Sequence, residues 1–373
     1  MMSDLLRMSR GTRMLRCMLA MTLVAVAWAH AQTNTASVTG EQGDARVLAT
    51  AQALAAQYNA ETGLFRGTGW WNSANRITAL ADASRTLHTQ QFDIVFENTL
   101  QKAQQRFPQF RNEYYDDEGW WALAWLDVYD LKHRGRYLKM AQSIFSDMTG
   151  GWNDSCGGGI WWKKNEKYKN AIANELFLAV AAHLASATKG GDRAKYLDWA
   201  EREWKWFRNS GMINSDFLIN DGLDSNCHNN GRTAWSYNQG VILNGLVELK
   251  QVRGDESSLT YVRNIASAAM SRLADGNGVL HDPCEPKCGE DGVQFKGIFV
   301  RDLVSASAIE TSPSTSDFLA KNADSLWENG RTAQNHFSTV WSGPPSDDQT
   351  GALIAALDLL TANQRARKLS VTH

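Results

Sequence analysis

The chain has 373 residues, of which 43% are hydrophobic, and this proportion is ample for a packed core. Its 40 acidic residues outnumber its 38 basic ones, so the formal net charge is −2. Because binding to phosphate backbones requires a basic surface, we exclude nucleic acid as a partner.

The first 31 residues have the pattern of a secretory signal peptide. Four arginines between positions 7 and 16 precede an apolar stretch at 18–29 that is short for a membrane span, and Ala-His-Ala at 29–31 fits a cleavage site. Removing four of the 38 basic and one of the 40 acidic residues leaves 34 against 39, a charge of −5. No later stretch is apolar and long enough to span a membrane. We therefore expect a monomer without a membrane anchor, exported through a Sec-type signal to the periplasm or the outside.

Helical patterns dominate the rest of the chain, after a polar segment at 32–42 that we expect to be disordered. Only six prolines and long Ala/Leu-rich runs favour helices, and strand signals are almost absent. The twelve predicted helices span 43–59, 74–88, 90–106, 118–132, 134–148, 169–188, 191–208, 234–251, 255–273, 294–310, 313–330 and 347–364.

The odd and even helices of this series differ in polarity. Odd helices carry a charged face, as in 193–203, whereas even helices are apolar nearly all round, as in 171–182. This alternation predicts an all-α fold, an (α/α)6 barrel of six inner and six outer helices. Because no Pro/Gly/Ser-rich linker interrupts it, we expect one domain over 43–365 and a short tail at 366–373. The N-termini of all inner helices should then meet at one end.

Four cysteines remain after the signal segment. They allow three pairings in an oxidising compartment, of which we favour Cys156–Cys227 and Cys284–Cys288. A zinc site is the competing interpretation for the second pair, but His281 is its only nearby histidine. We expect no metal and no cofactor.

An acidic pair, Asp116 and Asp117, stands within Tyr-Tyr-Asp-Asp-Glu-Gly-Trp-Trp at 114–121. Hydrolysis of a bond between two sugars uses two carboxyl groups, and aromatic faces suit the apolar face of a sugar ring. Acids in the first turn of a helix often only cap it and complement its dipole, and these residues fit that interpretation too.

The loops that precede the even helices share Trp, Tyr, Asn, Gln and Lys. Their convergence on one mouth favours a carbohydrate site over simple capping at the acidic pair. The alternatives are wedging of the Trp pairs between helix ends, capping by the asparagines and a surface position for the lysine. The predicted substrate contacts are Trp70, Trp71, Asn72, Asn75, Tyr115, Trp120, Trp161, Trp162, Asn174, Tyr237, Asn238, Gln239 and Lys296.

A second acidic pair, Asp347 and Asp348, follows two prolines near the last predicted helix. It is typical of a helix cap, and we keep it as a reserve candidate for the acid pair. The glycine run at 157–159 lacks the Lys-Ser/Thr of a phosphate-binding loop and a preceding strand, so we expect a tight turn there.

Five motifs in the same order resemble glycoside hydrolase family 76, the endo-α-1,6-mannanases. They are Tyr-Tyr-Asp-Asp at 114–117, Gly-Gly-Gly-Ile-Trp-Trp at 157–162, Lys-Asn-Ala at 169–171 with Asn-Glu-Leu at 174–176, Tyr-Asn-Gln-Gly at 237–240, and Phe-Lys-Gly-Ile-Phe at 295–299. The resemblance extends from about residue 45 to 360. It implies an (α/α)6 barrel, as the helical pattern does.

The resemblance also implies retaining hydrolysis of α-1,6-mannan or manno-oligosaccharides. Asp116 would be the nucleophile and Asp117 the general acid/base, with the exchange of these two roles within the pair as the alternative. One branch of the family resembles fungal wall proteins thought to transfer glycolipid anchors, so a transglycosylating relative is one alternative. A carbohydrate-binding protein without catalysis is another. Unsaturated glucuronyl hydrolases and epimerases share the barrel, but the mouth motifs lack their cationic clamp or His pair.

Overall fold

The computed structural model describes residues 40–254, 256–309, 313–346 and 351–371. The predicted signal peptide and the reserve pair Asp347–Asp348 lie outside these residues. The chain divides into two compact units, residues 1–46 and 47–373, and the second unit carries the site.

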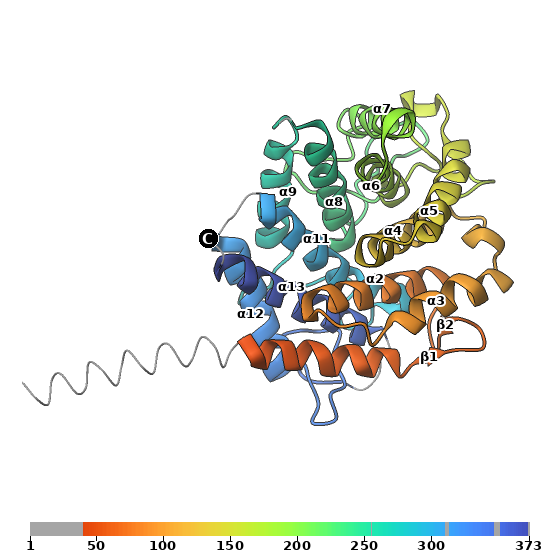
Figure 1. The fold of residues 1–373 in the computed structure, drawn as a ribbon. Coiled ribbons are helices and arrows are strands. Elements are labelled where there is room, and N and C mark those ends of the chain that lie inside the picture. Colours follow the sequence, from red (N-terminus) through yellow and green to blue (C-terminus); the bar gives the residue numbers. More distant parts are fainter. Residues whose placement is uncertain (1–39, 255, 310–312, 347–350, 372–373) are drawn as a thin grey trace, which may run out of the picture. The chain divides into compact units, whose positions relative to one another are not determined.

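Six helices of the second unit form a closed inner ring. Each packs against the next, from α2 to α4, α6, α8, α11 and α13, and α13 returns to α2 (Figure 1). α6 shows why these helices lie inside, because almost every one of its side chains is buried and its sequence is apolar nearly all round. Asn170 caps this helix by accepting a hydrogen bond from the Ala173 amide at 3.3 Å. The inner helices are α2 (Trp70–Leu87), α4 (Tyr115–Lys132), α6 (Ala171–Ala187), α8 (Ser236–Arg253), α11 (Phe295–Ile309) and α13 (Ala352–Val371).

The outer helices alternate with the inner ones along the chain and pack outside the ring, for example α5 on α4 and α7 on α6. They are α3 (Asp93–Lys102), α5 (Gly135–Met148), α7 (Gly190–Phe207), α9 (Leu259–Arg272) and α12 (Pro313–Asn329), with the helical residues 47–55 of the second unit as the first of the series. The ring and its outer layer confirm the predicted (α/α)6 barrel.

Short elements fill the connections. The strands β1 (Tyr58–Asn59) and β2 (Leu64–Phe65) pair antiparallel. The short helices are η1 (Ala103–Gln105), η2 (Pro108–Phe110), η3 (Thr149–Gly151), η4 (Ser155–Gly157) and α10 (Gly289–Gly292).

Two inner helices begin earlier than the sequence pattern predicted. α2 starts at Trp70 rather than 74 because the Trp70 ring packs on Phe107 and Trp121, with ring centroids 4.9 and 4.7 Å away. α4 starts at Tyr115 rather than 118, so the acidic pair lies inside its first turn. In both cases tertiary packing, rather than a polar capping residue, decides where the helix begins.

The two ends of the barrel sequence also differ from the prediction. Residues 40–42, predicted to be disordered, are helical. That helix ends at 55 rather than 59, because a turn at 56–57 leads into β1, which begins at Tyr58. Residues 366–371, predicted to be a tail, continue α13, whose Lys368 ammonium donates to the Thr86 carbonyl at 2.7 Å.

Candidate active site

A cleft of about 650 Å³ opens where the inner helices begin. Trp71, Asp116, Tyr237 and Phe295 come from the first turns of α2, α4, α8 and α11, and Asn170 is the cap of α6. The first turns of five inner helices therefore meet at one cleft. Its full lining is Trp71, Asp116, Trp120, Trp162, Glu166, Tyr168, Asn170, Asp221, Leu223, Asp224, Ser225, Asn230, Arg232, Tyr237, Asp291 and Phe295.

The acidic pair occupies the first turn of α4, and neither residue is its cap, which is Tyr114. The Asp116 carboxylate lines the cleft and accepts a hydrogen bond from the Trp162 indole N–H at 2.9 Å. The Asp117 carboxylate accepts one from the Asn112 amide at 2.5 Å. The two carboxyl groups therefore have separate partners on separate segments, which a pure capping role would not require.

Both carboxyl groups of the pair hold protons more tightly than exposed aspartates. Burial raises the pKa of Asp116 well above its ordinary value, and the charge of Asp117 raises it further, while the bond from Trp162 lowers it. Burial also raises the pKa of Asp117 to about 7, opposed by the bond from Asn112 and reinforced by the charge of Asp291. Near neutral pH the pair can therefore carry a proton and still present a carboxylate.

One wall of the cleft is a row of aromatic rings. Trp71 stacks on Trp120 with centroids 5.5 Å apart, Trp120 lies 6.4 Å from Tyr237, and Tyr237 stacks on Phe295 at 4.0 Å with an interplanar angle of 6°. The Trp71 indole is fixed by donating to the Asp291 carboxylate at 2.8 Å. These rings offer a flat apolar face beside the Asp116 carboxylate.

The other wall is polar and comes largely from the segment between α7 and α8. The Tyr168 hydroxyl donates to the Asp221 carboxylate, and the Asn230 amide donates to the Tyr168 oxygen at 3.0 Å. The Arg232 guanidinium lies 5.9 Å from the centre of the Tyr168 ring. Carboxylate, amide and guanidinium groups together can bind hydroxyls both as donors and as acceptors.

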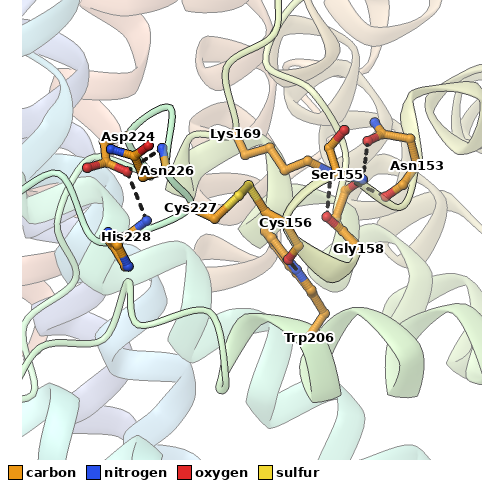
Figure 2. The surroundings of a disulfide bond; sticks show 11 residues. Asn153, Ser155, Cys156, Gly158, Lys169, Trp206, Asp224, Asn226, Cys227 and His228 are labelled. Atoms are coloured by element: carbon orange, nitrogen blue, oxygen red, sulfur yellow. Dashed lines mark hydrogen bonds between the residues drawn. A yellow bond between two sulfur atoms is a disulfide. The ribbon is translucent and has the colours of Figure 1, made fainter.

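The Cys156–Cys227 disulfide ties this polar wall to the loop before α6, with a Cα–Cα distance of 5.2 Å (Figure 2). Beside it, the Asp224 carboxylate accepts bonds from the backbone amides of Asn226 and His228 at 2.8 and 2.9 Å, which shapes a tight turn. Both favoured disulfides are present, including Cys284–Cys288. The alternative of a zinc site at the second pair was wrong, since its sulfurs are bonded to each other.

The family model described as Glycosyl hydrolase family 76 matches residues 44–372. The chain belongs to this family. Membership confirms the resemblance that the five motifs indicated, and it extends the resemblance to almost the entire described chain.

Fungal proteins are among the relatives that this chain resembles in sequence. The chain is 28% identical over 288 residues to the mannan endo-1,6-alpha-mannosidase DFG5 of Candida albicans, which covers 70% of this chain and 63% of that protein. It is 29% identical over 255 residues to DCW1 of Saccharomyces cerevisiae, also a mannan endo-1,6-alpha-mannosidase, covering 61% and 56%. The matches thus span less than two thirds of these relatives' own lengths.

Family 76 members also share the fold of this chain. An inactive variant of the alpha-1,6-mannanase of Salegentibacter sp. HEL1_6, with two adjacent aspartates replaced by alanine and alpha-1,6-mannotetrose bound, matches with a TM-score of 0.78. That match is 22% identical and covers 87% of this chain and 99% of that one. A family 76 mannosidase of Bacteroides thetaiotaomicron matches with a TM-score of 0.72 at 18% identity, over 88% and 100% of the two chains.

Five of the predicted site residues line the cleft of this family 76 member: Trp71, Asp116, Trp120, Trp162 and Tyr237. Asp117 lies next to the cleft, within electrostatic reach of Asp291. The polar wall was missed as a source of site residues. Its signal is the Asn/Asp/Gly-rich stretch at 220–231, in a connection between helices that is too long to be a simple turn.

Three predicted contacts in α2 are used inside the protein instead. Trp70 is buried in the aromatic core. The Asn72 amide donates to Asp291 at 3.2 Å, behind the cleft surface. Asn75 accepts a bond from the Arg301 guanidinium at 2.8 Å. These side chains follow the helix inward, so they stabilise the ring rather than face the cleft.

Three more predicted contacts anchor the loop before α6. Tyr115 is buried. The Trp161 ring lies under the Lys169 ammonium, 4.5 Å from its centre. Asn174 accepts from the Ile160 amide at 2.7 Å and donates to its carbonyl at 3.1 Å, a backbone-like pairing. None of the three lines the cleft, because their polar groups or faces are occupied within the protein.

The last three predicted contacts lie at the starts of α8 and α11 and are also buried. Asn238 is fully enclosed. Gln239 pairs with the Ile219 backbone, accepting at 2.9 Å and donating at 3.0 Å. Lys296 is buried and forms an ion pair of 2.7 Å with Glu285, so it is not a surface lysine.

Two kinds of feature are absent from the part of the chain that the structure describes. Among the described residues, no three His, Cys, Asp or Glu side chains are arranged to hold a metal ion. No helix in the same residues combines the length and apolar character needed to cross a membrane.

Proposed function

We propose that the protein is an exported, retaining glycoside hydrolase that cleaves α-1,6-mannosidic bonds in mannan. In this proposal Asp116 is the nucleophile and Asp117 the general acid/base. The observation that carries it is the position of the Asp116 carboxylate, held by Trp162 in a cleft with an aromatic wall, directly beside a carboxyl group whose pKa is raised to about 7.

The chemistry divides into two steps. In the first, the Asp116 carboxylate forms a bond to the anomeric carbon while the glycosidic bond breaks, and Asp117 gives its proton to the leaving oxygen. In the second, Asp117 takes a proton from water, whose oxygen attacks the anomeric carbon and releases Asp116. Two inversions give net retention. Adjacent Cα atoms are about 3.8 Å apart, so diverging side chains can reach the ~5–5.5 Å separation of retaining pairs.

The relatives support the choice of substrate and of residues. The fungal relatives are named mannan endo-1,6-alpha-mannosidases, and the Salegentibacter mannanase is described as inactive when two adjacent aspartates are replaced. This chain has two Asp-Asp pairs, at 116–117 and 347–348. We assign the chemistry to the first pair because Asp116 lines the cleft.

Asp116→Asn and Asp117→Asn, assayed separately on debranched yeast mannan, test these roles. Loss of a general acid lowers turnover by about 10²–10⁴-fold, and we expect at least this loss for each variant. On a manno-oligosaccharyl fluoride, whose leaving group needs no proton, azide should accelerate Asp117→Asn and give an α-mannosyl azide, because azide needs no base to attack the covalent intermediate. Asp154→Asn, an exposed aspartate, is the matched control.

Product analysis separates the alternatives. A retaining hydrolase releases the α-anomer first, detectable by NMR before mutarotation, and shortens the polymer. Products longer than the substrate would indicate transfer to another sugar. Binding of mannan without any product would contradict the proposal, as would near-normal turnover of either asparagine variant.

A further inference from the structure

The indole that contacts Asp116 belongs to a loop, not to a helix. Trp162 lies in the connection between η4 and α6, and regular secondary structure does not hold it there. Because its N–H donates to Asp116 at 2.9 Å, the position of this loop controls the electrostatic environment of that carboxylate. What fixes the loop therefore matters for chemistry.

Backbone hydrogen bonds join the loop to the start of α4. The Tyr115 amide donates to the Trp162 carbonyl at 2.9 Å, and the Lys164 amide donates to the Glu113 carbonyl at 2.9 Å. These two bonds lie on either side of Lys163, directly after the indole residue on the chain, and the Trp162 amide itself donates to the Tyr168 carbonyl at 2.8 Å. The two bonds to α4 attach the backbone of the loop to the N-terminal end of α4, but neither involves the indole side chain.

An ammonium group provides a further attachment at a different point. Lys164 Nζ lies 2.6 Å from Glu118 Oε1 and 2.6 Å from Asp147 Oδ2. Glu118 is completely buried and directly follows the acidic pair in α4, while Asp147 lies at the end of α5. Lys164 therefore connects the loop to the helix of the acidic pair and to its outer neighbour.

We propose that Lys164 is a positioning residue that, through Glu118 and Asp147, holds the Trp162 indole against Asp116. The inference rests on the proposed function for the role of Asp116. Its neighbour Lys163 provides a contrast, since it pairs at 3.4 Å with Glu113, whose side chain is 66% exposed, and lies over the Tyr114 ring. Lys164 therefore contacts the buried Glu118 beside the acidic pair, whereas Lys163 contacts an exposed side chain.

A purely structural role would predict a different result from a positioning role. If Lys164 only neutralised Glu118, its loss would lower the amount of folded enzyme and reduce activity by one factor at every pH. If it positions the indole, its loss removes a bond that lowers the pKa of Asp116. The nucleophile would then be protonated over a wider range, so the acid limb of kcat/KM would move to higher pH.

The test compares Lys164→Met, Lys164→Arg and the matched control Lys163→Met on α-1,6-manno-oligosaccharides. A hydrogen bond to a charged group is worth enough for a change of about ten- to a hundredfold, and we expect Lys164→Met to lose this much kcat/KM on the acid side. The loss should shrink as pH rises. Lys164→Arg should restore most of the activity and the original limb, and Lys163→Met should match the wild type.

A folding defect has its own control. Burial raises the pKa of Glu118 to about 8, so without its lysine partner the group can remain neutral. The double variant Glu118→Gln/Lys164→Met removes the charge altogether and should show the same shift of the acid limb. A pH-independent loss in both variants, or Lys164→Met behaving as Lys163→Met, overturns the inference. An inactive wild type would instead contradict the proposed function.

Discussion

A carboxylate that attacks an anomeric carbon must stay ionised in a cleft that favours its neutral form. Burial and the neighbouring Asp117 raise the pKa of Asp116, while the Trp162 indole and the first turn of α4 favour the anion. The same burial lets Asp117 keep a proton near neutral pH. Two identical side chains thus acquire different tasks from their separate hydrogen-bond partners.

The aromatic wall gives a prediction for a single residue, Tyr237. Its ring stacks on Phe295 at 4.0 Å and lines the cleft, so its loss removes both a packed pair and a sugar-facing surface. We expect Tyr237→Ala to raise KM for manno-oligosaccharides by about tenfold, in line with the energy of aromatic pairs.

Tyr237→Phe is the matched control for this prediction. It keeps the ring and removes only the hydroxyl, and its KM should stay within about twofold of wild type. Equal increases in KM for the two variants would show that the hydroxyl, not the ring face, contacts the substrate.

At the scale of single residues, the sequence predicts which end of the barrel carries the site but not the direction in which each side chain points. Trp71 and Asn72 are adjacent in the first turn of α2, yet only Trp71 lines the cleft while Asn72 supports Asp291 from behind. Successive side chains of an α-helix point about 100° apart, so one of these two faces the cleft and the other faces the protein interior. Lys296 was predicted to lie at the cleft, but its ammonium points to Glu285 in the connection that precedes α11.

Among the elements, the inner helices were the most predictable part of the fold. α6 is apolar nearly all round, and no arrangement other than enclosure satisfies such a helix. The start of α2 was less predictable, because Trp70 extends the helix through contacts with Phe107 and Trp121 that are distant in sequence. The polar wall carries no periodic signal, so its site residues emerge only from the fold.

The two disulfides provide a prediction at the scale of elements. Cys156–Cys227 closes a segment with a sequence separation of 71, whereas Cys284–Cys288 has a separation of 4. The chain-entropy model assigns about 4 kcal/mol of stabilisation to the long loop and about 2 kcal/mol to the short one. Replacing both cysteines of the first pair by serine should therefore destabilise the protein more than the same change in the second.

Urea unfolding of the two double variants measures this difference, and each serves as the other's control. We expect the free energy of unfolding to fall about twice as far for Cys156→Ser/Cys227→Ser. An equal fall would indicate that native contacts around each bridge, rather than the closed loops, determine the stabilisation.

For the second unit as a whole, the barrel contains a further cavity, of about 270 Å³, nearer the C-terminal ends of the inner helices. Trp120 lines both this cavity and the cleft, so one ring separates them. Acids and arginines share this space, and burial raises the pKa of Asp127 to about 7 and of Asp302 to about 6. Burial alone would lower the pKa of His183, but Glu248 and Asp130 raise it to about 9.

The raised pKa values of Asp127, Asp302 and His183 all make the folded protein less stable as pH rises. Between about pH 4 and 7 the native protein keeps protons on Asp127 and Asp302 that the unfolded chain has released, so the free energy of unfolding falls as pH rises. His183 continues the fall from about 6.5 to 9. Burial raises the pKa of Asp130, but the hydrogen bond to His183 and nearby positive charges lower it by more, so it lies below its ordinary value of 3.8. The stability that Asp130 adds is therefore lost only as pH falls through this lowered pKa. We therefore expect maximal stability at mildly acidic pH, measured by chemical unfolding from pH 4 to 9.

Glu175 allows one contribution to this slope to be isolated. It is fully buried in α6, neither carboxyl oxygen has a hydrogen-bond partner within the described residues, and burial raises its pKa well above 4.5. The native state must keep this group protonated while the unfolded chain ionises it, and each pH unit of that difference costs about 1.4 kcal/mol.

Glu175→Gln removes the penalty, so its stability should equal that of the wild type near pH 4.5 and exceed it increasingly toward pH 8. Glu61→Gln, at an exposed position, should show no such divergence. If Glu175→Gln shifts the free energy of unfolding by the same amount at pH 4.5 and pH 8, the carboxyl is ionised in the native barrel and must have a partner there.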